Sequence, residues 1–96
     1  MRLTIESNVA ERYGLHGAAV LAYLTRQHDQ DVTPEGWFAA PHIDLMYHYK
    51  ITRKTFTRVR DQLVEDGILQ LRKQPNLTYY RINWHAMNRL VDRGGD

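Results

Sequence analysis

Five basic residues fall between positions 50 and 60, and no acidic residue lies among them. They are Lys50, Arg53, Lys54, Arg58 and Arg60. The same stretch places Phe56, Val59 and Leu63 at the i, i+3, i+7 spacing of a helix with one buried face. A helix with an apolar back and a cationic front suits an element that packs on a core and faces phosphate groups. The alternative interpretation is an ordinary solvated surface helix.

Both ends of this helix carry residues that are typical of helix termini. Thr52 is a good N-cap, because its hydroxyl accepts a hydrogen bond from a free amide of the first turn. Gly67 is a good stop, because glycine adopts the left-handed conformation that often ends a helix. The pattern therefore predicts a helix over residues 52–66, with Lys54, Thr57, Arg58 and Asp61 opposite its apolar face.

Charge is unevenly distributed along the chain. The net charge of the 96 residues is only +2. Residues 1–49 hold three basic and six acidic residues, whereas residues 50–96 hold ten basic and five acidic residues. This asymmetry is a hint that the second half of the chain faces a polyanion.

Length and composition indicate one domain that covers residues 1–96. The chain is 43% hydrophobic and 25% charged, as ordinary soluble proteins are. It has no cysteine, which excludes disulfides and thiolate metal sites. The longest uncharged run, residues 13–25, is too short to span a bilayer, and the N-terminus lacks the layout of a signal peptide. We therefore expect a cytoplasmic protein with no membrane association.

Hydrophobic periodicity and turn residues predict a mainly α-helical fold with a small β-hairpin, in the α+β class. Before the basic helix we expect a strand at 2–6, a helix at 8–13 interrupted by Gly14, a helix at 16–28, a strand at 37–39 and a short helix ending near Tyr49. After it we expect strands at 68–72 and 77–83, joined by a turn at 73–76, and a closing helix at 84–91. This is the element order of a winged helix-turn-helix.

Several residues fit a family pattern. They are Leu45, Thr52, Thr55-Phe56-Thr57-Arg58, Leu63 and Gly67-Ile68-Leu69. With them, the stretch from Trp37 to Leu69 resembles the winged helix-turn-helix core of bacterial and phage DNA-binding proteins. Tyr13-Gly14-Leu15, the run from Ala18 to Leu24 and Tyr80-Arg81-Ile82-Asn83 are similar to the N-terminal domain of phage and plasmid replication-associated proteins, the replisome organisers.

This resemblance implies that the basic helix enters the major groove of double-stranded DNA. By residue type and wheel position, Lys54, Thr57 and Arg58 are candidates for base edges, and Lys50 and Arg53 for phosphates. The remaining candidates are two hydroxyls at the helix start and the hairpin residues that suit a minor groove or nearby backbone: Thr52, Thr55, Arg72, Lys73, Gln74 and Asn76. Thr55 fits helix initiation equally well, and Arg60 fits a salt bridge better than DNA.

Two features depart from the family pattern. Ala40 stands where a serine or threonine cap is usual. We also expect a free-standing module, without the further C-terminal domain that replication proteins usually carry. We expect a small regulator rather than an initiator.

Other chemistries have weaker support in the sequence. The group His42, Asp44 and His48 could suggest a metal site, but exposed polar residues on a short helix fit it better. We expect Trp37, Phe38, Tyr79 or Tyr80, and Trp84 to pack in the core. No phosphate loop, nucleophile elbow or paired carboxylates are apparent, so we expect neither an enzyme nor a cofactor.

The leading hypothesis is a sequence-specific, phage- or plasmid-like DNA-binding protein that acts in transcription or replication control. We expect a homodimer, because two half-sites multiply specificity, with contacts through the helices at 16–28 and 84–91. The alternative is a winged-helix protein-interaction module, such as a small phage-encoded inhibitor of a host complex with an anti-defence role. The acidic first half of the chain favours this alternative.

Overall fold

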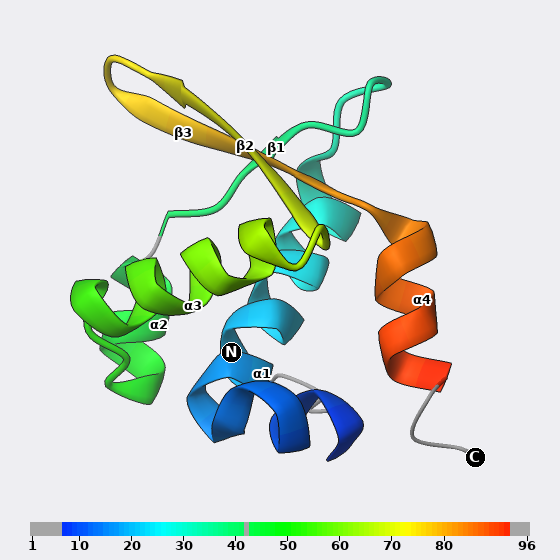
Figure 1. Cartoon of the computed structure of the whole chain (residues 1–96). Helices are drawn as coiled ribbons and strands as arrows, with labels where there is room; N and C mark the ends of the chain where they lie inside the picture. The colour runs from blue at the N-terminus through cyan, green and yellow to red at the C-terminus, as the bar shows by residue number, and fades with distance from the viewer. Residues whose placement is uncertain (1–6, 42, 93–96) are drawn as a thin grey trace.

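The computed structural model describes residues 7–41 and 43–92, and it is mainly helical with one small antiparallel sheet. The predicted α+β class is therefore confirmed, whereas the predicted strand at 2–6 lies outside the described residues. In chain order the elements are α1 (Ser7–Asp31), β1 (Phe38–Ala39), α2 (Ile43–Tyr49), α3 (Arg53–Glu65), β2 (Leu69–Gln74), β3 (Leu77–Ile82) and α4 (Trp84–Asp92). Figure 1 shows the β2–β3 hairpin projecting from the helices.

The sheet has the order β1-β3-β2, and both pairings are antiparallel. Tyr80 of β3 lies opposite Phe38 on one side and opposite Leu71 on the other. Tyr80 and Ile82 are buried, which places one face of the sheet against the helices. Because side chains alternate along a strand, the residues between them point to the outer face.

Helix α1 bends at Gly14, where the backbone leaves helical geometry (φ 79°, ψ 172°). The positive φ favours glycine, so the predicted interruption is confirmed. After the bend, Gly17 leaves no room for a side chain, because an added Cβ would lie 2.5 Å from the Cβ of Tyr13. The small residues of α1 therefore allow close packing, as Ala18 and Ala19, both buried, illustrate.

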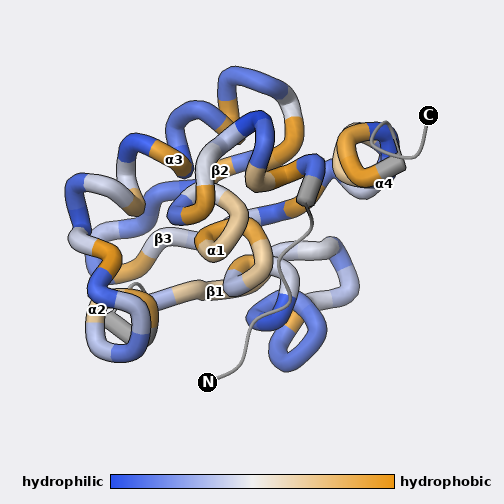
Figure 2. Tube along the Cα trace, turned by 90° about the horizontal axis from the view of Figure 1, so that it is seen from below, coloured by the Kyte–Doolittle hydropathy of each residue, from blue (hydrophilic) through white to orange (hydrophobic). Residues whose placement is uncertain are grey.

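The core is built from the apolar faces of α1 and α3 and the inner face of the sheet. Phe56, Val59 and Leu63 of α3 are buried as predicted, with exposed fractions of 4%, 0% and 0%. Figure 2 shows hydrophobic segments of α1 in the middle of the molecule, between α2 and α4. The apolar residues of α1 that we expected to contact a second copy are thus used inside the domain, among them Val20, Leu21 and Leu24.

Two tryptophans correct expectations about the core. Trp37 was expected to pack inside, but it is half-buried, outside the core cluster, and its ring lies against Arg72 and Arg81. Trp84 is the second. It was expected to pack inside, but 38% of the side chain is exposed at the start of α4. Its ring meets the edge of His28 instead, with centroids 4.8 Å apart. Met87 is the residue of α4 that is buried, and Leu90 and Val91 pack against the core. Trp84 is the first residue of α4, and it lies at the edge of the contact that Met87, Leu90 and Val91 make with the core.

Helix α3 begins and ends as its sequence predicts. The hydroxyl of Thr52 accepts a hydrogen bond from the amide of Thr55 at 3.2 Å. At the other end, Gly67 has a φ of 78°, which allows the chain to turn into β2. In the part of the chain that the structure describes, no helix combines the length and apolar character that a membrane span needs.

Candidate nucleic-acid interface

The first half of α3 and the turn before it carry four exposed basic side chains, and none forms an ion pair with another described residue. These are Lys50, Arg53, Lys54 and Arg58. Arg60 differs, because its guanidinium pairs with Asp61 at 3.1 Å and only 14% of its side chain is exposed. The structure therefore confirms the predicted salt bridge of Arg60 and leaves the other four charges facing solvent.

Lys50 has an unfavourable backbone conformation in the turn between α2 and α3. Its φ of 57° makes it the one non-glycine residue with a positive φ among the described residues. That conformation costs an ordinary residue about 1–2 kcal/mol, and glycine would avoid the cost. Lys50 directly follows α2, and its amide donates a hydrogen bond to the carbonyl of Met46, as a left-handed residue at a helix C-terminus commonly does. The conformation therefore ends α2 and places a cationic side chain in the turn.

The residues of α3 divide into two rows. Arg53 and Thr57 lie one helical turn apart and face the hairpin, where both line a groove. Lys54 and Arg58 form the next row and are exposed to solvent. Thr52 and Thr55 have hydroxyls that hydrogen-bond each other at 3.2 Å, so helix initiation already engages both.

The groove lies between α3 and the tip of the hairpin, and its volume is about 320 Å³. Its polar lining comes from Arg53, Thr57 and Arg60 on one side and from Gln74, Asn76 and Thr78 on the other. Phe56 and Tyr80 form its floor together with neighbouring apolar residues, and their rings meet edge to face at 6.4 Å. Helix α3 and the hairpin, which are separate segments of the chain, thus line the same groove with amide, hydroxyl and guanidinium groups.

The hairpin residues predicted to act together are separated by the structure. Gln74 and Asn76 line the groove, and Lys73 is exposed beside them opposite Thr78. Arg72 does not join them. It lies opposite Tyr79 in the sheet, and its guanidinium carbon sits 4.3 Å from the ring centroid of Trp37 on the outer face. Strand alternation separates Arg72 from Lys73, and the contact with Trp37 holds Arg72 on the outer face. Gln74 lies two residues after Arg72, and it lines the groove at the end of β2.

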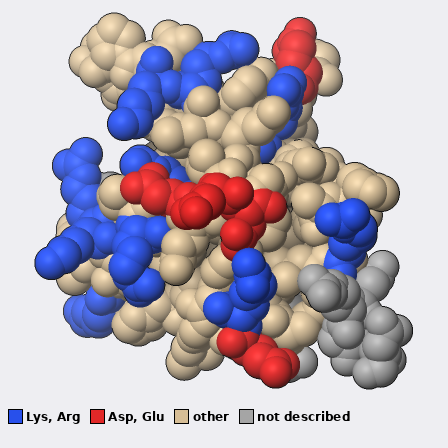
Figure 3. All heavy atoms as spheres, in the orientation of Figure 1, with Lys and Arg blue, Asp and Glu red and all other residues tan. Residues whose placement is uncertain are grey.

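Charge is segregated along α3. Figure 3 shows Lys and Arg side chains gathered over the α2–α3 turn and over the hairpin, with a band of Asp and Glu side chains between them. The acidic residues of the later turns and C-cap of α3 are Asp61, Glu65 and Asp66, all exposed. The partial positive charge of a helix N-terminus adds to the basic end. An anion is therefore favoured at the first half of α3 and disfavoured at the second.

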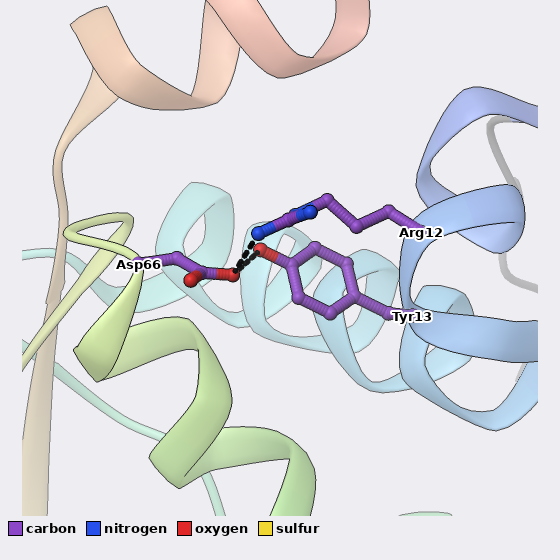
Figure 4. A network of polar contacts seen from close by, with 3 residues as sticks. All are labelled: Arg12, Tyr13 and Asp66. Carbon is purple, nitrogen blue, oxygen red and sulfur yellow. Dashed lines mark hydrogen bonds and ion pairs between the residues drawn. The ribbon is translucent and has the colours of Figure 1, made fainter.

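A hydrogen-bonded network holds the acidic end of α3 to α1 (Figure 4). Asp66 accepts from the hydroxyl of Tyr13 at 2.5 Å and from the guanidinium of Arg12 at 3.1 Å. Burial, and then the hydrogen bond to Asp66, raise the pKa of Tyr13 to about 12. The hydrogen bonds to Tyr13 and Asp66 raise the pKa of Arg12. The network fixes the C-terminus of α3 and compensates one of its negative charges.

The alternative metal site at His42, Asp44 and His48 falls largely outside the described structure, because His42 and the side chain of Asp44 are not described. Among the side chains that are described, no group of three metal-ligating residues comes together. His48 lies edge-on to Tyr47, with ring centroids 5.0 Å apart.

No family model matches this sequence, and no curated protein or solved structure matches it either. The candidate interface is therefore defined by the residues of this chain alone.

Proposed function

We propose that this chain is a winged helix-turn-helix domain that binds double-stranded DNA in transcription or replication control. One observation carries the proposal: four basic side chains without ion-pair partners among the described residues stand at the start of α3, next to a polar groove. Binding phosphate there would neutralise charges that the fold leaves uncompensated. The order of α2, α3 and the hairpin is the order that such domains have.

In this proposal the first half of α3 enters the major groove. Lys54 and Arg58, in the outer row, reach base edges, and the fork of Arg58 suits the two acceptors of guanine. Lys50 and Arg53 contact the phosphates that flank them. The hairpin tip follows the adjacent backbone with Lys73, Gln74 and Asn76. The acidic later turns of α3 stay outside the groove, which limits the contact to about two helical turns.

The experiment is a binding titration with a randomised duplex library, followed by sequencing of the bound fraction. We expect enrichment of a short motif and salt-dependent affinity. The matched variants are Lys54→Gln, in the outer row, and Gln62→Lys, an exposed position on the same helix beyond the basic half. Lys54→Gln is expected to weaken binding and change the enriched motif, whereas Gln62→Lys is expected to leave the motif unchanged. Absence of any enrichment would contradict the proposal.

A homodimer is part of the proposal, because two half-sites supply the specificity that one short contact lacks. The expected face of α1 is buried in the core, so the remaining candidates are exposed apolar residues outside it. Leu15 and Trp84 are exposed by 66% and 38%. Light scattering on the full chain is expected to report twice the mass of 11.3 kDa, and Trp84→Ser to lower it.

A second candidate function is supported by a separate observation on α2. Tyr47 and Met46 are exposed by 76% and 43%, beside the basic turn at Lys50. Aromatic and methionine side chains are enriched in protein interfaces, so this apolar spot favours a partner protein. Capture of host proteins by the wild type and by Tyr47→Ser, each with nuclease present, separates the two functions. Loss of capture in the variant would support the protein-binding role.

A further inference from the structure

The outer face of the sheet, on the side away from the helices, carries a cluster of cationic and aromatic residues. Since Tyr80 and Ile82 point into the core, Tyr79 and Arg81 point outward. Across the β2–β3 register they lie opposite Arg72 and Gln70. Trp37, which precedes β1, joins them. We call Trp37, Gln70, Arg72, Tyr79 and Arg81 the outer-face cluster.

Trp37 is the centre of this cluster. The guanidinium carbon of Arg72 lies 4.3 Å from its ring centroid, and that of Arg81 lies 4.7 Å away. Arg81 is fixed further by its Nε, which donates a hydrogen bond to Oε1 of Gln70. Its aliphatic stem packs on Gly36, where an added Cβ would come within 3.3 Å of Arg81. Both guanidinium groups are thus held in place before any ligand binds.

The cluster carries two positive charges that no described carboxylate neutralises. Among the side chains that the structure describes, neither Arg72 nor Arg81 forms an ion pair. The indole ring covers one face of each guanidinium group. The terminal N–H groups at the guanidinium edge can donate hydrogen bonds to an anion. Arg72 is exposed and Arg81 is half-buried, so solvent reaches the site. Charge complementarity therefore calls for an anionic ligand.

We propose that the outer-face cluster binds a single strand of DNA. Arg72 and Arg81, both held over the Trp37 ring, contact phosphates, while Tyr79 and the outer guanidinium planes offer surfaces on which unpaired bases stack. The pairing of basic and aromatic side chains is the chemistry of single-strand binding, and a duplex keeps its base faces stacked inside. The site uses the face of the hairpin opposite the α3 groove, and it does not require that the groove bind duplex DNA.

The test follows the fluorescence of Trp37. The chain has two tryptophans, so Trp84→Phe leaves Trp37 as the only one. Oligothymidylate added to this protein at low salt is expected to quench the Trp37 emission, with an affinity that falls as salt rises. In the same background, Arg72→Gln and Arg81→Gln each remove a charge-assisted phosphate contact and are each expected to weaken binding by about 10- to 150-fold. Circular dichroism verifies that every variant is folded.

A charge control separates this site from a general effect of net charge. Arg89→Gln removes an exposed arginine of α4, outside both proposed surfaces, and is expected to leave oligothymidylate binding unchanged. Trp37→Leu, followed by polarisation of a labelled strand, tests the site without relying on emission. Unchanged affinity in the Arg72 and Arg81 variants would overturn the proposal, as would loss of binding in Arg89→Gln. Equal or tighter binding of oligouridylate or of polyglutamate would overturn the choice of DNA.

Discussion

Lys50 combines an unfavourable backbone conformation with a solvent-facing charge, and this combination makes a prediction at the scale of a single residue. Because φ is 57°, Lys50→Gly removes strain of about 1–2 kcal/mol. Glycine also gains entropy in the unfolded chain, which offsets about 0.5–1 kcal/mol. We expect the variant to be more stable to urea by about 0.5–1 kcal/mol and weaker in binding duplex DNA.

The matched control for Lys50→Gly is Arg58→Gly. Arg58 is also exposed but lies in the interior of α3, where glycine costs about 1 kcal/mol. Opposite changes in the urea midpoint are expected for the two variants. A loss of stability in Lys50→Gly would contradict the strain assigned to this turn.

Arg53 and Arg58 are expected to differ in what they contribute to DNA binding. Arg58→Ala removes a base contact, so affinity for the preferred site should fall by about 1–3 kcal/mol and affinity for random DNA should change little. Arg53→Ala removes a phosphate contact and should weaken every sequence alike. Titrations of both variants on the selected and on the scrambled duplex measure the difference. If Arg58→Ala lowers the affinity equally on both duplexes, Arg58 does not contact a base edge.

At the scale of elements, α3 depends on Phe56 for its position against the sheet. Phe56 is 4% exposed and meets Tyr80 edge to face. Phe56→Ala leaves a cavity and should lower the free energy of unfolding by about 3–5 kcal/mol. Val64→Ala is the control on the same helix, because 39% of Val64 is exposed. Urea titrations should show a change below about 1 kcal/mol for that control.

The contact between α1 and the end of α3 is expected to weaken at high pH. The pKa of Tyr13 is about 12 in the folded protein and about 10 in the unfolded chain, so the unfolded state loses its proton first. The stabilisation is therefore complete below pH 10 and is lost as the pH rises to 12. After allowance for partial solvent exposure, it is on the order of 1 kcal/mol. Tyr13→Phe should flatten the stability profile between pH 10 and 12, as followed by urea denaturation.

The elements whose ends are set by neighbouring residues were predicted well. The helix predicted at 52–66 spans Arg53–Glu65 with Thr52 as its N-cap, because capping depends on residues three positions apart. The bend at Gly14 and the hairpin strands follow from equally local signals. Features that join distant segments were missed. Asp66 meets Tyr13 across 53 positions, and no periodicity encodes that contact.

The candidate site was predicted in its composition and only partly in its arrangement. Helical period separated Lys54 and Arg58 from the buried face correctly. Thr57, which was predicted to share their face, is half-buried and lines the groove beside the hairpin. Arg72 was grouped with the hairpin tip, although strand alternation and Trp37 draw it to the outer face. The signal was present in the sequence as the alternation of Leu71 and Arg72. The position of Trp37 beside them depends on the pairing of β1 with β3, which spans about forty residues of chain.

At the scale of the whole molecule, a net charge of +2 gives little long-range attraction to DNA, so affinity must come from local charge. If Lys50, Arg53 and Lys73 each neutralise one phosphate, the logarithm of affinity falls against the logarithm of salt with a slope of about −2.7. Raising salt from about 50 to 200 mM should then weaken binding by about 40-fold. Fluorescence polarisation with a labelled duplex at several salt concentrations measures this slope.

Two charge variants with opposite effects test whether the slope comes from α3. Arg53→Ala removes one phosphate contact, so the slope should become shallower by about 0.9. Asp61→Asn removes a negative charge from the later turns of α3, and it also frees the guanidinium of Arg60 from its ion pair. Because Arg60 lines the groove, this variant should bind more tightly and show a steeper slope. A slope that neither variant changes would mean that the cations at the start of α3 do not contact DNA, and the apolar spot at Met46 and Tyr47 would become the leading site.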